Sequence, residues 1–141
     1  MLRTEKQVAL DTVINSSRGS IDHYRWVADA GDDEQIKTLL DRLALERERI
    51  IDRLAPQMYK LGDMPSAPDP EKLAVEEMLT QLKATFSENE KDALLDSLDE
   101  LDSQLLQEIS EAVRLDFDAE TLAILRELEK SVAEARKNRG N

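Results

Sequence analysis

The apolar positions of this chain recur with the spacing of an α-helix along four long segments. These segments cover residues 4–30, 32 or 33 to 61, 87–115, and a last one that begins near residue 118; residues 70–86 form a shorter fifth segment. In each of them the apolar residues fall three or four positions apart, as on one face of a helix. No segment alternates with the period of a strand. The predicted stripe of the first helix consists of Leu10, Val13, Ile14, Ser17, Ile21, Tyr24, Val27 and Ala28.

Residues at the segment ends mark where the first two helices start and stop. Thr4 followed by Gln7 fits a capping box. Gly31 and Gly62 each follow a helical segment, so we expect both to end helices, Gly31 as a left-handed stop. Pro56 lies late in the second segment, where we expect it to kink the helix or to mark the beginning of its end.

The third and fourth long helices also carry start signals. Ser87 and Glu90 fit a second capping box, and Asp118 is the expected cap of the last helix. We expect that last helix to fray through residues 137–140, where its basic residues suit the negative pole of the helix dipole.

The longest gap between long helices lies in the middle of the chain, at residues 63–87. The short helix 70–86 inside it spans about 25 Å, and with its linker the connection can cover about 40 Å, the length of a long helix. We therefore expect the second and third long helices to run parallel, since an up-down-up-down bundle needs only a few residues here. The predicted fold class is all-α: one domain, residues 1–141, forming a ferritin-like four-helix bundle whose long crossover contains a short fifth helix.

The polar positions inside the stripes are few. In the second helix, residues 46–49 read Glu-Arg-Glu-Arg, so its seam is interrupted near the centre by a carboxylate or a guanidinium. In the third helix Asp102 sits beside the middle of the stripe. In the first helix, the segment 15–20 contains four small residues, Ser16, Ser17, Gly19 and Ser20, which let a neighbouring helix or a ligand approach closely.

Charge narrows the range of partners. The net charge is −12, and residues 88–129 hold 14 acidic and 3 basic residues, so most of the excess lies there. An acidic surface repels nucleic-acid phosphates and anionic lipids, so we expect neither nucleic acid nor membrane as a partner. The acidic face is a solvated surface, or it attracts a basic protein or divalent cations. There are no cysteines, and no run of about 20 apolar residues, so a cytoplasmic protein is expected.

The residues that give ferritin-like bundles their metal chemistry are missing. Such a site takes a Glu from each of two helices and a Glu-x-x-His pair from each of the other two. This chain has one histidine, His23, and the nearest remnant of the motif is Glu46-x-x-Arg49, whose guanidinium is not a ligand. We therefore expect no enzyme activity, no catalytic residues, no cofactor and no metal.

One alternative keeps a metal. Four carboxylates lie near the middle of their helices: Asp22, Glu46, Asp102 and Glu129. If they converge, they form an oxygen-only site of the kind that Mg²⁺, Ca²⁺ or Mn²⁺ takes. The alternative function is then a carboxylate-rich, di-iron or di-manganese protein for oxidation or metal storage.

A family resemblance agrees with the fold. Residues 10–25 of the first helix, 39–54 of the second, 82–84 before the third, and 93–113 are similar to a bacterial family of ferritin-like four-helix-bundle proteins of unknown function. That family is related to rubrerythrins at the level of fold. The resemblance implies a bundle, and the missing histidines argue against its ancestral iron chemistry.

These observations favour a non-enzymatic bundle that acts through its surface, as a protein-interaction or stress-related accessory protein. It can self-associate through the apolar side of the 70–86 helix, which a Leu79→Glu, Met78→Lys double variant tests. It can also bind a basic protein through the acidic face. A third possibility is an acidic mimic that occupies the basic groove of a nucleic-acid-binding protein.

Overall fold

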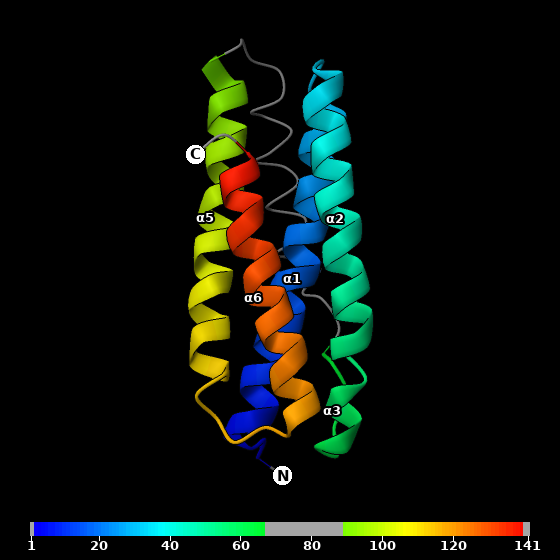
Figure 1. The fold of residues 1–141 in the computed structure, drawn as a ribbon, viewed down its shortest axis with the longest axis vertical. Helices are drawn as coiled ribbons and strands as arrows, with labels where there is room; N and C mark the ends of the chain where they lie inside the picture. The colour runs from blue at the N-terminus through cyan, green and yellow to red at the C-terminus, as the bar shows by residue number, and fades with distance from the viewer. Residues whose placement is uncertain (1, 67–88, 140–141) are drawn as a thin grey trace.

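The computed structural model describes residues 2–66 and 89–139. In this part of the chain the elements are α1 (Glu5–Ala30), α2 (Glu34–Leu54), the single turn α3 (Gln57–Lys60), α5 (Asn89–Ala112) and α6 (Ala119–Asn138). All are helical, and the long ones stand side by side as a bundle (Figure 1). The predicted 70–86 helix, with the self-association surface on Met78 and Leu79, lies outside the described residues, as does the capping box at Ser87.

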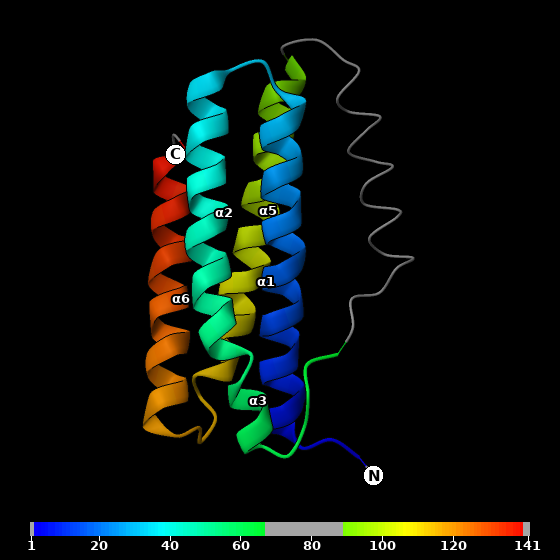
Figure 2. The same ribbon diagram turned by 90° about the vertical axis from the view of Figure 1, so that its right-hand side faces the viewer.

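The four long helices occupy the corners of the bundle. Helix α1 packs on α2 and α5, and α6 packs on the same two helices. In Figure 1, α1 and α6 rise from the end where the N-terminus lies, whereas α2 and α5 descend toward it. Figure 2 shows the same directions from the side. Each packed pair is therefore antiparallel, and α2 and α5 run parallel at diagonal corners, as the long crossover predicts.

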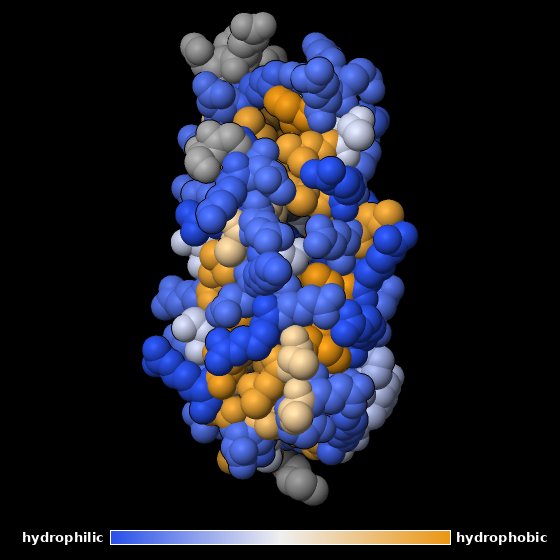
Figure 3. Space-filling model, in the orientation of Figure 1, coloured by the Kyte–Doolittle hydropathy of each residue, from blue (hydrophilic) through white to orange (hydrophobic). Residues whose placement is uncertain are grey.

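The core lies where the apolar stripes meet. All eight predicted stripe positions of α1 are buried. Helix α6 buries Ile124, Leu125, Leu128, Val132 and Ala135, which are spaced as on one face of a helix. Outside the core, most of the surface seen in Figure 3 is hydrophilic, with apolar residues showing between the helices.

Side-chain caps start the helices where the sequence predicts them. In the capping box of α1, the Gln7 backbone N–H donates to the Thr4 hydroxyl over 3.2 Å, and the Thr4 N–H donates to the Gln7 side chain over 2.8 Å. The Asp118 carboxylate accepts from the Thr121 N–H over 2.8 Å and caps α6. The prediction for Gly31 is wrong: its φ of −96° and ψ of 161° are extended. The short turn into α2 leaves the helix in an extended conformation, which any residue can adopt.

The second predicted helix is broken near its end. Helix α2 stops at Leu54, and Pro56 precedes the separate turn α3. The predicted end at residue 61 is therefore wrong for α2, whereas the prediction that Pro56 marks the beginning of the end is confirmed. The ring of the proline and its missing N–H disrupt the ladder of backbone hydrogen bonds. Gly62 follows α3 with a φ of 77°. This left-handed conformation is the one that favours glycine.

A polar clamp leads the chain from α3 back onto α1. The Asp11 carboxylate is nearly buried and accepts from the Ser66 N–H over 2.7 Å and from the Ser66 hydroxyl over 2.6 Å. Arg3 binds the same carboxylate over 2.6 Å and Asp63 over 2.7 Å. These bonds lower the pKa of Asp11 against the effect of its burial, which raises it.

Candidate functional site: a buried ionic cluster

The four carboxylates of the predicted alternative metal site do not converge. Asp22 and Glu46 are exposed, and Glu129 is half-buried and pairs with Arg126 over 3.5 Å. Only Asp102 lies in the core. Across residues 2–66 and 89–139, no three His, Cys, Asp or Glu side chains are grouped so that they could hold a metal ion.

The centre of the bundle holds a guanidinium. Arg47 is 1% exposed and occupies the α2 seam between Leu43 and Ile50. Its Nη1 donates to Asp102 Oδ1 over 2.7 Å and to the Ser20 hydroxyl over 2.9 Å. The interruption of the seam, open between a carboxylate and a guanidinium from the sequence alone, is therefore a cation.

Asp102 joins the helices. It is fully buried on α5, and its Oδ1 accepts from Arg47 of α2. Its Oδ2 accepts from the Tyr24 hydroxyl of α1 and, over 2.6 Å, from Nη1 of Arg139, which follows α6. The four long helices thus meet at one carboxylate.

Arg139 is the largest departure from the sequence analysis. The expected fraying does not include it: its backbone N–H donates to the Ala135 carbonyl over 3.1 Å, and its side chain is 2% exposed. Its guanidinium also donates to the Tyr24 hydroxyl and reaches Asp99 over 3.4 Å. Asp99 in turn pairs with Arg136 over 2.8 Å.

Tyr24 lies between the two buried cations. The guanidinium carbon of Arg47 is 4.7 Å from the centre of its ring, and that of Arg139 is 5.3 Å away, so both are within cation–π range. Burial raises the pKa of the Tyr24 hydroxyl, and the Asp102 carboxylate adds to the rise. The hydroxyl therefore stays protonated and remains a donor to Asp102.

The electrostatics keep Arg47 charged. Burial acts to lower the pKa of Arg47, but the Asp102 carboxylate and Tyr24 together outweigh this effect, so the pKa lies above its ordinary value. At the outer edge of the cluster, Arg136 lowers the pKa of Asp99. The buried part of the cluster therefore holds two guanidinium groups and one carboxylate.

Two polar atoms of this region have no hydrogen-bond partner among the described residues. They are Nε of Arg47 and the hydroxyl of Ser17, which is fully buried one turn from Ser20. Unsatisfied groups in a core cost stability, so the cluster is not an ideally saturated network.

His23 is placed apart from this cluster. It is half-buried, and its Nε2 lies 3.1 Å from the Ser97 hydroxyl. Ser97 itself donates to the Leu94 carbonyl over 2.6 Å. The contact ties α1 to α5.

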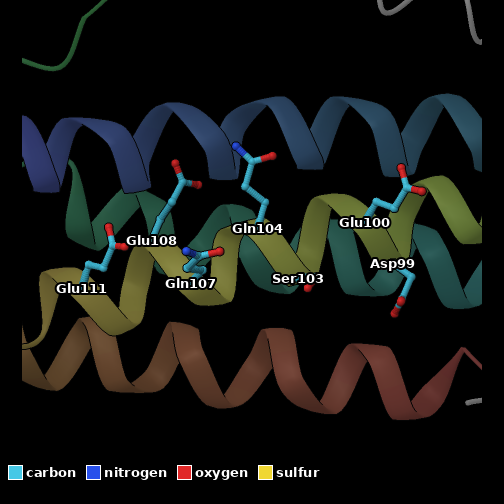
Figure 4. Close-up of a pocket in the computed structure, with 7 residues that line it drawn as sticks. All are labelled: Asp99, Glu100, Ser103, Gln104, Gln107, Glu108 and Glu111. Atoms are coloured by element: carbon cyan, nitrogen blue, oxygen red, sulfur yellow. The ribbon is translucent and has the colours of Figure 1, made fainter.

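A polar hollow lies along α5. Figure 4 shows the residues that line it, with Gln104 and Glu108 pointing toward α1 and Asp99 toward α6. The Glu108 carboxylate accepts from the Ser16 hydroxyl over 3.0 Å. Four of the lining residues are acidic, in the segment where the sequence places the charge excess; the full set is Asp99, Glu100, Ser103, Gln104, Gln107, Glu108 and Glu111.

The geometry defines an all-α bundle whose centre is a buried ionic cluster. The chain belongs to a family described as a domain of unknown function (DUF2383), whose model matches residues 6–115. That range contains Tyr24, Arg47 and Asp102, while Arg139 lies beyond it. No curated protein and no solved structure matches the chain. Among the described residues, no helix is both long enough and apolar enough to cross a membrane.

Proposed function

We propose that this protein is a non-enzymatic, ferritin-like bundle that acts through its surface, as a protein-interaction or stress-related accessory protein. One observation carries the proposal: the bundle centre is filled by the pairs of Arg47 and Arg139 with Asp102, at 2.7 and 2.6 Å. The parallel α2 and α5, which need a long crossover, support the ferritin-like layout.

A filled, cationic centre argues against interior chemistry. In ferritin-like metal proteins, carboxylates and histidines project inward from the four helices. Here two guanidinium groups project inward, and each repels a divalent cation. Both oxygens of Asp102 already accept hydrogen bonds from charged or hydroxyl donors, so the one central carboxylate has no oxygen left without a donor.

The surface offers charge rather than apolar area. Few large apolar side chains are exposed in the described part of the chain: Leu2, Val8, Leu45, Tyr59 and Met64. The α5 hollow instead groups acidic side chains with amides and a hydroxyl. Charge complementarity of this kind steers association, and its partner is a basic protein surface.

Elemental analysis of the untagged, folded protein tests the first half of the proposal. We expect neither iron nor manganese after dialysis against buffer without chelator, with helical circular dichroism intact. Near-stoichiometric metal would contradict the proposal and would make Asp102 and Glu46 the first residues to change.

Charge reversal on α5 tests the second half. Glu100→Lys with Glu111→Lys alters two exposed residues of the hollow, and Glu34→Lys with Asp41→Lys is a matched control on α2 with the same net charge. We expect the first pair to abolish salt-sensitive capture of a basic partner and the control pair to retain it. Equal capture by both variants would show that the hollow is not the interaction surface.

A further inference from the structure

The surroundings of Arg139 have the composition of a binding site for a guanidinium group. Asp102 Oδ2 lies 2.6 Å from Nη1, and Asp99 Oδ1 lies 3.4 Å from Nη2. The Tyr24 hydroxyl accepts from the same Nη1, and the Tyr24 ring lies below the guanidinium carbon at 5.3 Å. Two carboxylates and an aromatic face form the arrangement that a planar, delocalised cation prefers over a compact ammonium.

The walls of this site and its occupant come from different parts of the fold. Tyr24 belongs to α1, and Asp99 and Asp102 belong to α5, which packs directly on α1. Arg139 comes from the residue after the last one of α6. Removal of the Arg139 side chain therefore leaves both walls and the Arg47–Asp102 pair in place.

The outer edge of the site is partly exposed to solvent. Asp102 is fully buried, but the Asp99 side chain is 30% exposed and stands at the outer edge. Arg136, which pairs with Asp99, is 37% exposed. A ligand that replaces Arg139 can enter past these two residues.

We propose that Tyr24, Asp99 and Asp102 form a guanidinium-binding site, which Arg139 fills as an internal ligand and which an external alkylguanidinium occupies when Arg139 withdraws. The external group is a free small molecule or the side chain of an arginine on another protein. Arg139 competes with it, because a tethered ligand acts at a high effective concentration. The site shares Asp99 with the acidic hollow on α5. The charge-reversal variant changes Glu100 and Glu111 and leaves Asp99, so the two proposals are tested separately.

The test is binding of methylguanidinium chloride to the Arg139→Ala variant, measured by calorimetry and by the shift in melting temperature. We expect Arg139→Ala to bind with an affinity at least about tenfold higher than the wild-type protein, which still carries the tethered competitor. We expect a rise in its melting temperature with millimolar ligand, because a ligand that binds only the folded state stabilises it. Tetramethylammonium chloride at equal ionic strength should give no such rise.

Two further variants separate the site from general effects. Arg136→Ala removes a guanidinium that contacts Asp99 but leaves Arg139 in place, so it should bind no better than wild type. Arg139→Ala with Asp99→Asn removes the outer carboxylate, and we expect at least about tenfold weaker binding than in Arg139→Ala, because charge-assisted hydrogen bonds are the strong ones. Equal responses of wild type, Arg136→Ala and Arg139→Ala, or no binding to a folded Arg139→Ala, would overturn the proposal.

If Arg139→Ala is unfolded, recovery of its helical circular dichroism by methylguanidinium supports the proposal, and failure to recover overturns it. A second arm compares methylguanidinium with a short peptide that carries one arginine, and with the same peptide carrying lysine. If the arginine peptide binds and the lysine peptide does not, the external guanidinium group is the side chain of an arginine on another protein. Binding of methylguanidinium without either peptide points to a small molecule.

Discussion

The Asp102→Asn substitution is the sharpest test of the buried cluster. It keeps the size of the side chain and removes the one negative charge that faces Arg47 and Arg139. Both arginine side chains are 2% exposed, and Asp102 is fully buried. After the substitution Arg139 still contacts Asp99, at 3.4 Å, but Arg47 is left without a carboxylate and keeps the Ser20 hydroxyl, the Tyr24 ring and a neutral amide.

The expected loss follows from the cost of an uncompensated buried charge. Removing one partner of a buried ion pair costs about 3–5 kcal/mol of unfolding free energy. A protein of this size is stable by about 5–15 kcal/mol, so the loss is a large share of the total. At about 3–4 °C per kcal/mol for a domain of this length, the melting temperature should fall by about 10–20 °C.

Urea unfolding followed by circular dichroism measures this loss as a lower midpoint with an unchanged slope. Asp96→Asn is the matched control, because Asp96 is an exposed carboxylate on the same helix, and it should change stability by less than about 0.5 kcal/mol. A second variant replaces the whole cluster through Arg47→Met, Asp102→Leu, Arg139→Met and Tyr24→Phe. It should recover most of the loss, because apolar side chains of similar volume remove the desolvation cost together with the charges. A loss below about 1 kcal/mol for Asp102→Asn would refute this reasoning.

The remaining predictions concern the backbone and the polar contacts. Gly19→Ala should stabilise the protein by about 0.5–1 kcal/mol, because Gly19 lies inside α1 and a Cβ there meets no atom within 4 Å. Gly62→Ala should destabilise it by about 1 kcal/mol or more, because the φ of Gly62 is 77°. Both changes are measured by urea unfolding. Ser66→Ala should cost about 1 kcal/mol in the same assay, because it removes the hydroxyl donor to Asp11. Hydrogen bonds from the side chain and the backbone N–H of Thr121 hold the pKa of Asp118 at about 2, below its ordinary 3.8. The unfolded chain then binds more protons near pH 3, so stability is full above about pH 4 and falls toward pH 2. Asp118→Asn should flatten this fall in acid-unfolding curves while it keeps the cap.

The sequence predicts the bundle well because its signals are local and periodic. The α1 stripe is complete from residue 10 to residue 28, and each of its positions is buried. The capping box at Thr4 and the cap at Asp118 depend on residues three apart, so they can be recognised without tertiary contacts. Gly31 is different, because a glycine after a helix ends it in more than one conformation and the next helix decides which.

The cluster could not be predicted in the same way, although Arg47, Asp102 and Arg139 each lie at helical spacing from the apolar residues of their own segment. Arg47 lies four positions after Leu43 and three before Ile50, and Asp102 lies four after Leu98 and three before Leu105. Arg139 lies four after Ala135. A lone charge at such a position is usually at the margin of a helix face. The sequence does not show that the opposite charges lie at the same height along the bundle axis. That depends on the axial positions of the helices relative to one another.

That alignment gives the cluster a physical role in specifying the fold. Four amphipathic helices can pack with several neighbour choices and with one-turn shifts, and apolar stripes alone discriminate weakly among them. Asp102 meets Arg47 across the diagonal and Tyr24 and Arg139 on its two neighbours only in the observed arrangement. A shift of one turn moves a helix by about 5.4 Å, well beyond the reach of an ion pair at its present length. Each alternative therefore leaves a guanidinium or a carboxylate buried without its partner, at several kcal/mol. We infer that the cluster selects one register of the bundle, and that the variant with apolar side chains at these four positions should keep most of the wild-type stability while it loses part of this selectivity.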